Sequence, residues 1–300
     1  MSIRRLTLLV AGMAVVAGSA LLAQSTGPAT TRPGGGNAPP ASQPAASNPA
    51  APEPQLQDKR DRLAEVVARI LSNKHGWTIW RNKSALQADF AIEFPGQPAM
   101  EGTMIYDINR GRSRIDLKDG PTLVFDGQKA WVSPAGAKFA GARFNLLTWP
   151  LLLTASVRLQ EPQISATDYQ QKLFQGEPCD SFRIAFKKSA VAMPSEWYRV
   201  YGGQQDREIR GISFMTKEAD GGPSGSQHRQ RAVSFADFQK VEGVSLPTTW
   251  KFWNSDDLHG ADGDQIGKAT ITNMKFIPAT DDAFTKPADA REDESSRSAQ

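Results

Sequence analysis

The chain has 300 residues and a formal net charge of +3, with 35 Lys and Arg residues against 32 Asp and Glu residues. This balance, without a dense basic cluster interleaved with aromatic residues, excludes the usual signature of a nucleic-acid-binding protein. The single cysteine, Cys179, excludes an intramolecular disulfide, so the hydrophobic core must stabilise the fold. We expect Cys179 to be a small buried residue rather than a nucleophile.

The first 23 residues have the pattern of a secretory signal peptide. Arg4 and Arg5 precede an apolar run from Leu6 to Leu22. Small residues in this region are compatible with cleavage after Ala23 or Ala20. An uncleaved inner-membrane anchor is the alternative, because an apolar run of about 17 residues is close to the shortest that spans a bilayer. In both cases the remainder is expected in the periplasm or otherwise exported, and without a cysteine after the run no lipoprotein-type modification is expected.

Composition divides the remainder into a linker, one domain and a tail. Residues 24–57 are rich in Pro, Ala and Gly, so they cannot bury enough apolar surface to offset chain entropy and are predicted to be a disordered linker. Residues 288–300 are polar and are predicted to be a disordered tail. The folded domain is therefore expected to cover residues 58–287.

The domain is predicted to open with a helix and to continue as a sheet. The helix has one apolar face with a helical spacing, made of Leu63, Val66, Val67, Ile70 and Leu71. From Leu86 onward, apolar and polar residues alternate in short runs separated by tight turns such as Asp126-Gly127. This pattern predicts about ten or eleven antiparallel strands. Those for which we find a clear pattern are residues 86–94, 100–108, 115–117, 123–125, 130–132, 182–186, 197–201, 211–215, 233–235, 247–253 and 269–276.

A leucine-rich segment interrupts the strands. Residues Ala142 to Leu159 are predicted to form a pair of short helices broken at Pro150. Residues Leu146 to Leu153 are nearly all apolar, so this part must be buried or must cover something buried. Aromatic residues at alternating strand positions either pack a core or line a cavity between the sheet and this cover.

The sequence has no motif that indicates catalysis. His75, His228 and His259 are scattered and have no His or Cys partner at the spacing of a metal site. The acidic loop from Asp256 to Asp264 lacks the ligand order and final Glu of an EF-hand, so we expect an ordinary hairpin loop. There is no G-x-S-x-G motif and no phosphate-binding loop. No metal, no cofactor and no catalytic residue is therefore predicted.

The order of elements and several short motifs resemble the LolA/LolB-like superfamily of periplasmic lipoprotein carriers, most closely an uncharacterised LolA-like branch. The matching stretches are 86–90 (LQADF), 101–102 (EG), 105–107 (IYD), 111–117 (GRSRIDL) and 125–131 (FDGQKAW). The resemblance covers about residues 58–287. It implies a mainly β (α+β) fold: an open, curved antiparallel half-barrel with helices covering its concave face.

The same resemblance implies an apolar cavity for acyl chains beneath a helical lid. The residues expected to line it are Phe90, Ile92, Phe94, Met104, Tyr106, Ile115, Phe125, Trp149, Leu151 and Leu152. In carriers of this family an arginine in the hairpin after the second strand, followed by a proline, locks the lid. Arg110 occupies the corresponding place, although Gly111 stands where the proline is expected.

These patterns give a leading hypothesis and two rivals. The leading hypothesis is a non-catalytic periplasmic carrier for a lipid or lipidated ligand, whose partners are acyl chains and, transiently, a membrane. The first rival is an envelope interaction or sensor module on the same fold, with a packed interior and a protein partner. The second rival is an enzyme, which would require titratable groups to converge in a cleft.

Overall fold

The computed structural model describes residues 54–187, 197–218, 227–256 and 260–293. The predicted signal peptide and residues 24–53 of the predicted linker lie outside these ranges. The helices are α1 (Pro54–Lys74), α2 (Trp77–Trp80), α3 (Ala142–Thr154) and the 3-10 helix η1 (Asp281–Phe284). The strands are β1 (Ala85–Glu93), β2 (Met100–Asp107), β3 (Ser113–Leu117), β4 (Thr122–Phe125), β5 (Ala130–Ser133), β6 (Ile164–Phe174), β7 (Glu177–Phe186), β8 (Tyr198–Gly203), β9 (Ile209–Glu218), β10 (Gln227–Val241), β11 (Val244–Asp256), β12 (Gly260–Ile277) and β13 (Arg291–Glu292).

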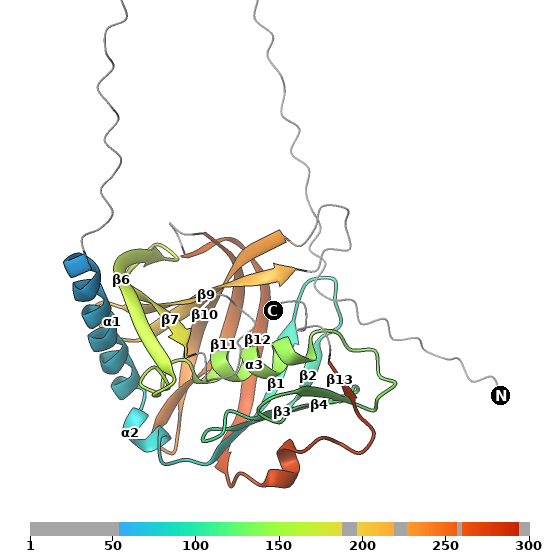
Figure 1. Cartoon of the computed structure of the whole chain (residues 1–300). Coiled ribbons are helices and arrows are strands. Elements are labelled where there is room, and N and C mark those ends of the chain that lie inside the picture. The colour runs from blue at the N-terminus through green and yellow to red at the C-terminus, as the bar shows by residue number, and fades with distance from the viewer. Residues whose placement is uncertain (1–53, 188–196, 219–226, 257–259, 294–300) are drawn as a thin grey trace, which may run out of the picture.

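Within the described residues, 13 strands form one sheet in the order β13-β5-β4-β3-β2-β1-β12-β11-β10-β9-β8-β7-β6. Every neighbouring pair is antiparallel. The sheet stays open, because β13 and β6 lie at its two ends. Register shifts in the β1–β12, β6–β7, β8–β9 and β11–β12 pairs bend the strands. The predicted open, curved antiparallel sheet with a helix over its concave face is thus confirmed (Figure 1).

The two faces of the sheet differ as the alternation of the sequence requires. On β1, Leu86, Phe90 and Ile92 are buried in the main core. Asp89 points to the other face, where its carboxylate accepts hydrogen bonds from Thr103 at 2.6 Å and from Asn273 at 2.8 Å. Apolar side chains therefore collect on the concave side, and paired polar groups cover the convex side.

Two regions of the sheet differ from the prediction. β6 was not predicted, because a bulge centred on Asp168, whose φ is 52°, breaks its alternation of polar and apolar residues. The segment expected to be a hairpin loop, Asp256 to Asp264, is shorter as a loop than predicted, because it already contains the paired ends of the long strands β11 and β12. The backbone pairing of β11 with β12 continues into residues that are polar, so the pattern of apolar residues did not reveal it. Residues 257–259, at the tip of the hairpin, lie outside the described ranges.

The folded part extends past both predicted boundaries. α1 already begins at Pro54, inside the predicted linker. At the other end, Arg291 and Glu292 of the predicted disordered tail pair with β5 as β13. Phe284 is almost completely buried on the way to this strand. The polar tail composition did not indicate this strand, because its stability depends on an edge strand some 160 residues earlier in the chain.

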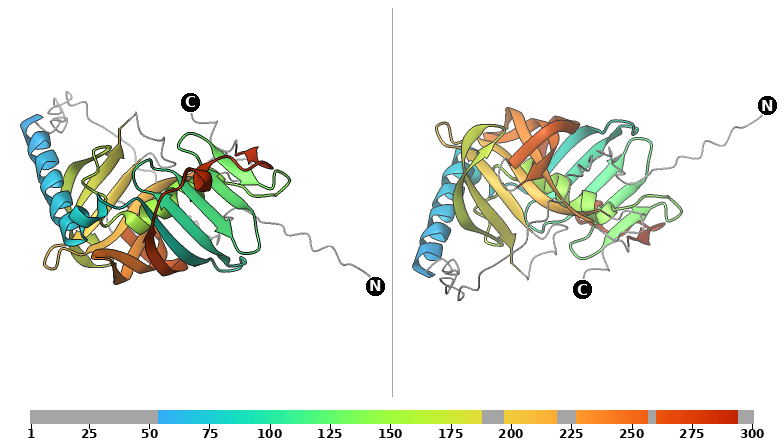
Figure 2. Two further views of the ribbon diagram at one scale, coloured as in Figure 1. Left: turned by 90° about the horizontal axis from the view of Figure 1, so that it is seen from below. Right: turned by 90° about the horizontal axis from the view of Figure 1, so that it is seen from above.

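Helix α1 buries only two of the five residues of its predicted apolar face. Val67 and Leu71 belong to the main core, whereas Leu63, Val66 and Ile70 are exposed. The helix lies along the edge strand β6, beyond which it forms the flank of the molecule (Figures 1 and 2). No helix in the part of the chain that the structure describes is both long and apolar enough to cross a bilayer.

Candidate ligand-binding site between α3 and the sheet

Helix α3 lies in the hollow of the curved sheet (Figure 1). A helix that is apolar on all sides is stable only when it is surrounded. That is the situation here, because the last nine residues of α3, from Leu146 to Thr154, are all buried. The following residues, Ala155 to Leu159, are also buried. The cover is therefore an apolar segment enclosed by the half-barrel, not a surface helix.

The structure corrects the prediction that Pro150 divides this segment into two helices. Proline has no N–H, so it leaves the carbonyl oxygen of Leu146, four residues earlier, without its helical partner. The buried Ser113 hydroxyl on β3 donates a hydrogen bond of 2.6 Å to this oxygen. The hydrogen bond from the sheet replaces the missing one within the helix, and α3 continues through Pro150.

The residues predicted to line a cavity come together at this interface. Nine of them are buried in the main core, and Phe94 is half-buried against it. The nine are Phe90, Ile92, Met104, Tyr106, Ile115, Phe125, Trp149, Leu151 and Leu152. In this closed arrangement they fill the space between α3 and the sheet with their own side chains.

A row of aromatic rings runs from the surface into this interface. Phe94 lies in a shallow depression open to solvent, and its ring centroid is 5.1 Å from that of Phe252. The ring of Phe252 is 6.0 Å from Trp149 on α3, which in turn is 6.5 Å from Trp250. Trp250 is 6.5 Å from Phe235. Phe235, Trp250 and Phe252 were not among the predicted site residues, although their alternation with polar residues on β10 and β11 was visible in the sequence.

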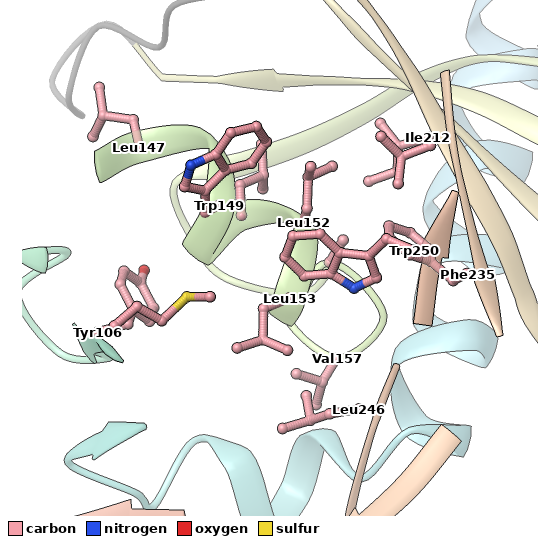
Figure 3. Close-up of a cluster of buried hydrophobic side chains, with 14 of the residues drawn as sticks. Tyr106, Leu147, Trp149, Leu152, Leu153, Val157, Ile212, Phe235, Leu246 and Trp250 are labelled. Atoms are coloured by element: carbon pink, nitrogen blue, oxygen red, sulfur yellow. The ribbon is translucent and has the colours of Figure 1, made fainter. Parts of the chain in front are cut away.

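Three polar groups in this apolar interface have no hydrogen-bond partner among the described residues. They are the indole N–H groups of Trp149 and Trp250 and the hydroxyl of Thr148. Figure 3 shows the two indoles beside each other, with nitrogens that do not face one another. Buried polar groups in proteins are nearly always paired, since an unpaired one costs free energy. The α3–sheet interface therefore contains three polar groups whose hydrogen bonding is not satisfied by the described residues.

A buried ion pair holds the C-terminal end of the cover. Arg158 donates to Glu161 through Nε at 2.9 Å and Nη2 at 2.6 Å. Burial opposes the charge of Arg158, but the neighbouring Glu161 carboxylate raises the pKa of the guanidinium above its ordinary value. Gln163 and the indole of Trp80 also donate to Glu161, and the guanidinium lies 5.1 Å from the ring centroid of Tyr106. This cluster fastens the end of the cover to α2 and β2.

The N-terminal end of α3 is fastened by a residue from the far end of the chain. Helix α3 follows Gly141, whose φ is 70°, and no side chain caps it locally. Instead the backbone N–H of Arg143 donates to the Asp293 carboxylate at 2.8 Å. An acidic side chain at a helix N-terminus satisfies an unpaired N–H and interacts favourably with the helix dipole. Asp293 therefore caps α3 from across the β5–β13 edge.

The predicted lid lock, Arg110, lies elsewhere. Its side chain is exposed and pairs with Asp281 on η1, next to Arg112, which pairs with both Asp281 and the buried Asp107. Arg110 thus ties the C-terminal segment to the β2–β3 hairpin. A role for Arg110 in locking the lid stays a prediction. Arg158 and Asp293 make polar contacts at the two ends of the cover, and neither was predicted from sequence.

Two kinds of reactive centre, a metal site and a cysteine nucleophile, find no support among the described residues. Among them no group of three or more His, Cys, Asp or Glu side chains is placed to hold a metal ion. Cys179 is fully buried, and burial raises the pKa of its thiol to about 11. A thiol with this pKa is protonated at neutral pH and is a poor nucleophile.

No family model and no curated protein matches the sequence. Similar solved structures include a LolA superfamily protein from Nitrosomonas europaea, with 11% identity and a TM-score of 0.49, covering 74% of this chain and 97% of that protein. They also include a DUF1329 family protein from Desulfovibrio piger, with 10% identity and a TM-score of 0.48, covering 75% of this chain and 97% of that one. The first bears the family name that the sequence motifs suggested. At these identities the likeness concerns the general architecture and indicates no ligand.

Proposed function

We propose that this chain is an exported, non-catalytic binding protein for a lipid or lipidated ligand, whose acyl chain takes the place of the N-terminal half of α3 against the concave face. One observation supports this above the others. The hollow of an open half-barrel is filled by a helix that is apolar on all sides, and an acyl chain could make the same contacts. Each methylene transferred from water into this interface would contribute about 0.8 kcal/mol.

The contacts of the cover indicate how it would open. Pro150 leaves the helix without a backbone hydrogen bond at its middle, and Ser113 compensates for this only while α3 is seated. The buried Arg158–Glu161 pair holds the C-terminal end. The N-terminal half, residues 142–149, would therefore turn outward about Pro150, releasing the cap that Asp293 provides. This motion would uncover the rings of Trp149 and Trp250 together.

The unpaired donors suit a ligand with a polar end. An acyl chain joined through an ester, amide or carboxylate has carbonyl oxygens that accept hydrogen bonds from indole N–H groups. Binding would give the buried Trp149 and Trp250 donors the acceptors that they lack in the closed form. The proposed ligand class is therefore an acyl chain with a carbonyl group, not a plain hydrocarbon.

Native mass spectrometry and solvent extraction of protein purified from its own host test the proposal. We expect bound lipid masses that disappear after extraction, and saturable binding of a fluorescent fatty acid by the emptied protein. Trp149→Ala should weaken binding of the probe. Trp131→Ala is the matched control, because Trp131 is on the other face of the sheet, with its indole N–H donated to Asp126 at 2.8 Å. Absence of both lipid and probe binding would rule the proposal out.

The packed interior favours a second candidate, an envelope module that binds a protein partner without opening. Crosslinking and affinity capture from envelope extracts distinguish the two. Under this alternative, a defined partner is captured equally well by the wild-type protein and by a Trp149→Ala variant, and no lipid is extracted from either.

A further inference from the structure

Helix α1 presents an unpartnered apolar stripe on its outer side. Leu56, Leu63, Val66 and Ile70 are 46%, 40%, 48% and 41% exposed. Their spacings of seven, three and four residues place them on one face of the helix. Single exposed apolar residues are normal on a protein surface, but a row of four on one helix face marks an interaction surface. We call these four residues the outer stripe.

Unpaired cations border the outer stripe. Lys59, Arg62 and Arg69 are exposed, and none of them forms an ion pair within the described residues. With 3.6 residues per turn, Lys59 falls within the stripe, and Arg62 and Arg69 follow along one border. The exposed acids of the helix, Asp58 and Glu65, fall beyond these arginines, farther from the stripe. The charge beside the apolar row is therefore positive.

The other side of α1 is fixed to the fold, so the outer stripe cannot turn inward. Val67 and Leu71 are packed in the main core. The backbone N–H of Asp168 on β6 donates to Asp61 at 2.9 Å. The Ser72 hydroxyl donates to the carbonyl oxygen of Val157, in the segment after α3. The stripe is thus a rigid feature of the folded domain.

The position of α1 suits a flat partner. In all three views the helix lies at the outer edge of its side of the molecule, and only a turn beside its C-terminal end reaches as far outward (Figures 1 and 2). A planar surface could therefore contact the stripe, whose last residue, Ile70, lies before the C-terminal end of the helix. Moreover, α1 is the first described element after the N-terminal 53 residues, which contain the apolar run 6–22. Under the alternative in which this run stays uncleaved as an anchor, α1 would be tethered close to the bilayer.

We propose that α1 docks on the surface of an anionic bilayer, with the outer stripe in the headgroup region and Lys59, Arg62 and Arg69 against lipid phosphates. An amphipathic helix with an apolar face and basic borders lies in a membrane interface in this way. The stripe lies outside the α3–sheet interface, so this proposal is independent of acyl binding.

A fluorophore sensitive to its surroundings tests the docking on the full chain. Val66→Cys carries the label on the stripe, and Leu173→Cys carries it at an equally exposed position on β6, where Leu173 is 44% exposed. The buried Cys179 should not react. With phosphatidylglycerol vesicles we expect a blue shift and quenching by brominated lipid at position 66, and neither at position 173. With phosphatidylcholine vesicles, or at about 0.5 M salt, the signal at position 66 should be at least severalfold weaker.

Charge reversal gives a second, quantitative readout. Arg62→Glu with Arg69→Glu should lower partitioning onto anionic vesicles more than tenfold, since each basic residue near such a surface adds roughly a fivefold gain. Lys240→Glu with Lys251→Glu, on exposed sheet positions, is the control and should have a much smaller effect. A label at position 66 that remains water-like on anionic vesicles overturns the proposal. So does a blue shift that rises with protein concentration in the absence of lipid, because a second copy would then be the occupant.

Discussion

The hydroxyl of Ser113 on β3 lies 2.6 Å from the carbonyl oxygen of Leu146 on α3, and this oxygen is the one that Pro150 leaves without a helical partner. One side chain of the sheet thus completes the hydrogen bonding of the helix that covers it. The contact also ties the middle of α3 to the concave face. The hydrogen bonding of α3 at Pro150 is therefore complete only while the helix is packed against the sheet.

Ser113→Ala should therefore destabilise the fold by about 1–3 kcal/mol, because it leaves a buried carbonyl oxygen unpaired. Urea unfolding measures this directly. Ser165→Ala removes an exposed hydroxyl that donates to a strand carbonyl oxygen, and it should cost far less. Equal losses in the two variants would show that the carbonyl oxygen of Leu146 finds another donor. If α3 covers a ligand site, Ser113→Ala should also speed the uptake of an acyl probe.

The Arg158–Glu161 pair should behave as a buried ion pair does. Removing one partner, as in Glu161→Leu or Arg158→Met, leaves an uncompensated charge and should cost about 3–5 kcal/mol. The double variant restores neutrality and should be more stable than either single variant. A double-mutant cycle from chemical denaturation gives the coupling. Additive effects would mean that the two charges are solvated independently, contrary to their burial.

The contribution of Asp293 as the cap of α3 can be measured apart from the other contacts of the C-terminal segment. Asp293→Ala should cost about 1 kcal/mol, the usual value of a lost helix cap. Hydrogen exchange should increase in the first turn of α3, around residues 142–145, and not in the neighbouring strands. Asp282→Ala, an exposed acid of η1, is the matched control. Unchanged exchange at α3 in the Asp293 variant would contradict the capping role.

His75 gives a pH dependence with a defined sign. Burial lowers the pKa of this histidine below its ordinary value of 6.5, although Glu208, 3.3 Å from its Nε2, acts in the opposite direction. The unfolded chain then binds the proton first as the pH falls. Stability linked to His75 is therefore complete above about pH 6.5 and is lost as the pH drops toward the folded-state pKa.

Unfolding measured between about pH 8 and pH 5 for the wild type and for His75→Gln tests this sign. The wild type should lose more stability on acidification than the variant. The reverse order would mean that the ion pair with Glu208 outweighs burial.

The alternation of apolar and polar residues predicted most of the sheet, because most of its strands have one buried and one exposed face. Runs such as residues 86–94 have one apolar and one polar side, and each became a strand with one buried face. β6 escaped prediction since the bulge at Asp168 changes the face of the residues that follow. The predicted helix break at Pro150 was wrong for a different reason: the compensating donor, Ser113, lies in another part of the sequence.

The apolar residues of the candidate site could be predicted from the sequence, whereas the polar residues that hold the two ends of α3 could not. Alternation identifies which residues face inward, so Phe90, Met104 and Trp149 could be named. Alternation does not show whether inward residues fill a space or surround one. Asp293 and Arg158 act through partners that only the folded chain brings near, and no local pattern distinguishes them from other charged residues.

The cap of α3 has a consequence for the order of folding. Helix α3 is made early, but the carboxylate that caps it belongs to residue 293, about 150 residues later. During synthesis, the N-terminus of α3 stays uncapped until residue 293 has been made, so the segment that carries its leucines and Trp149 is not yet fully fastened. A chain that stalls before this point leaves this apolar segment incompletely fastened, and partly folded states of this kind are prone to aggregation.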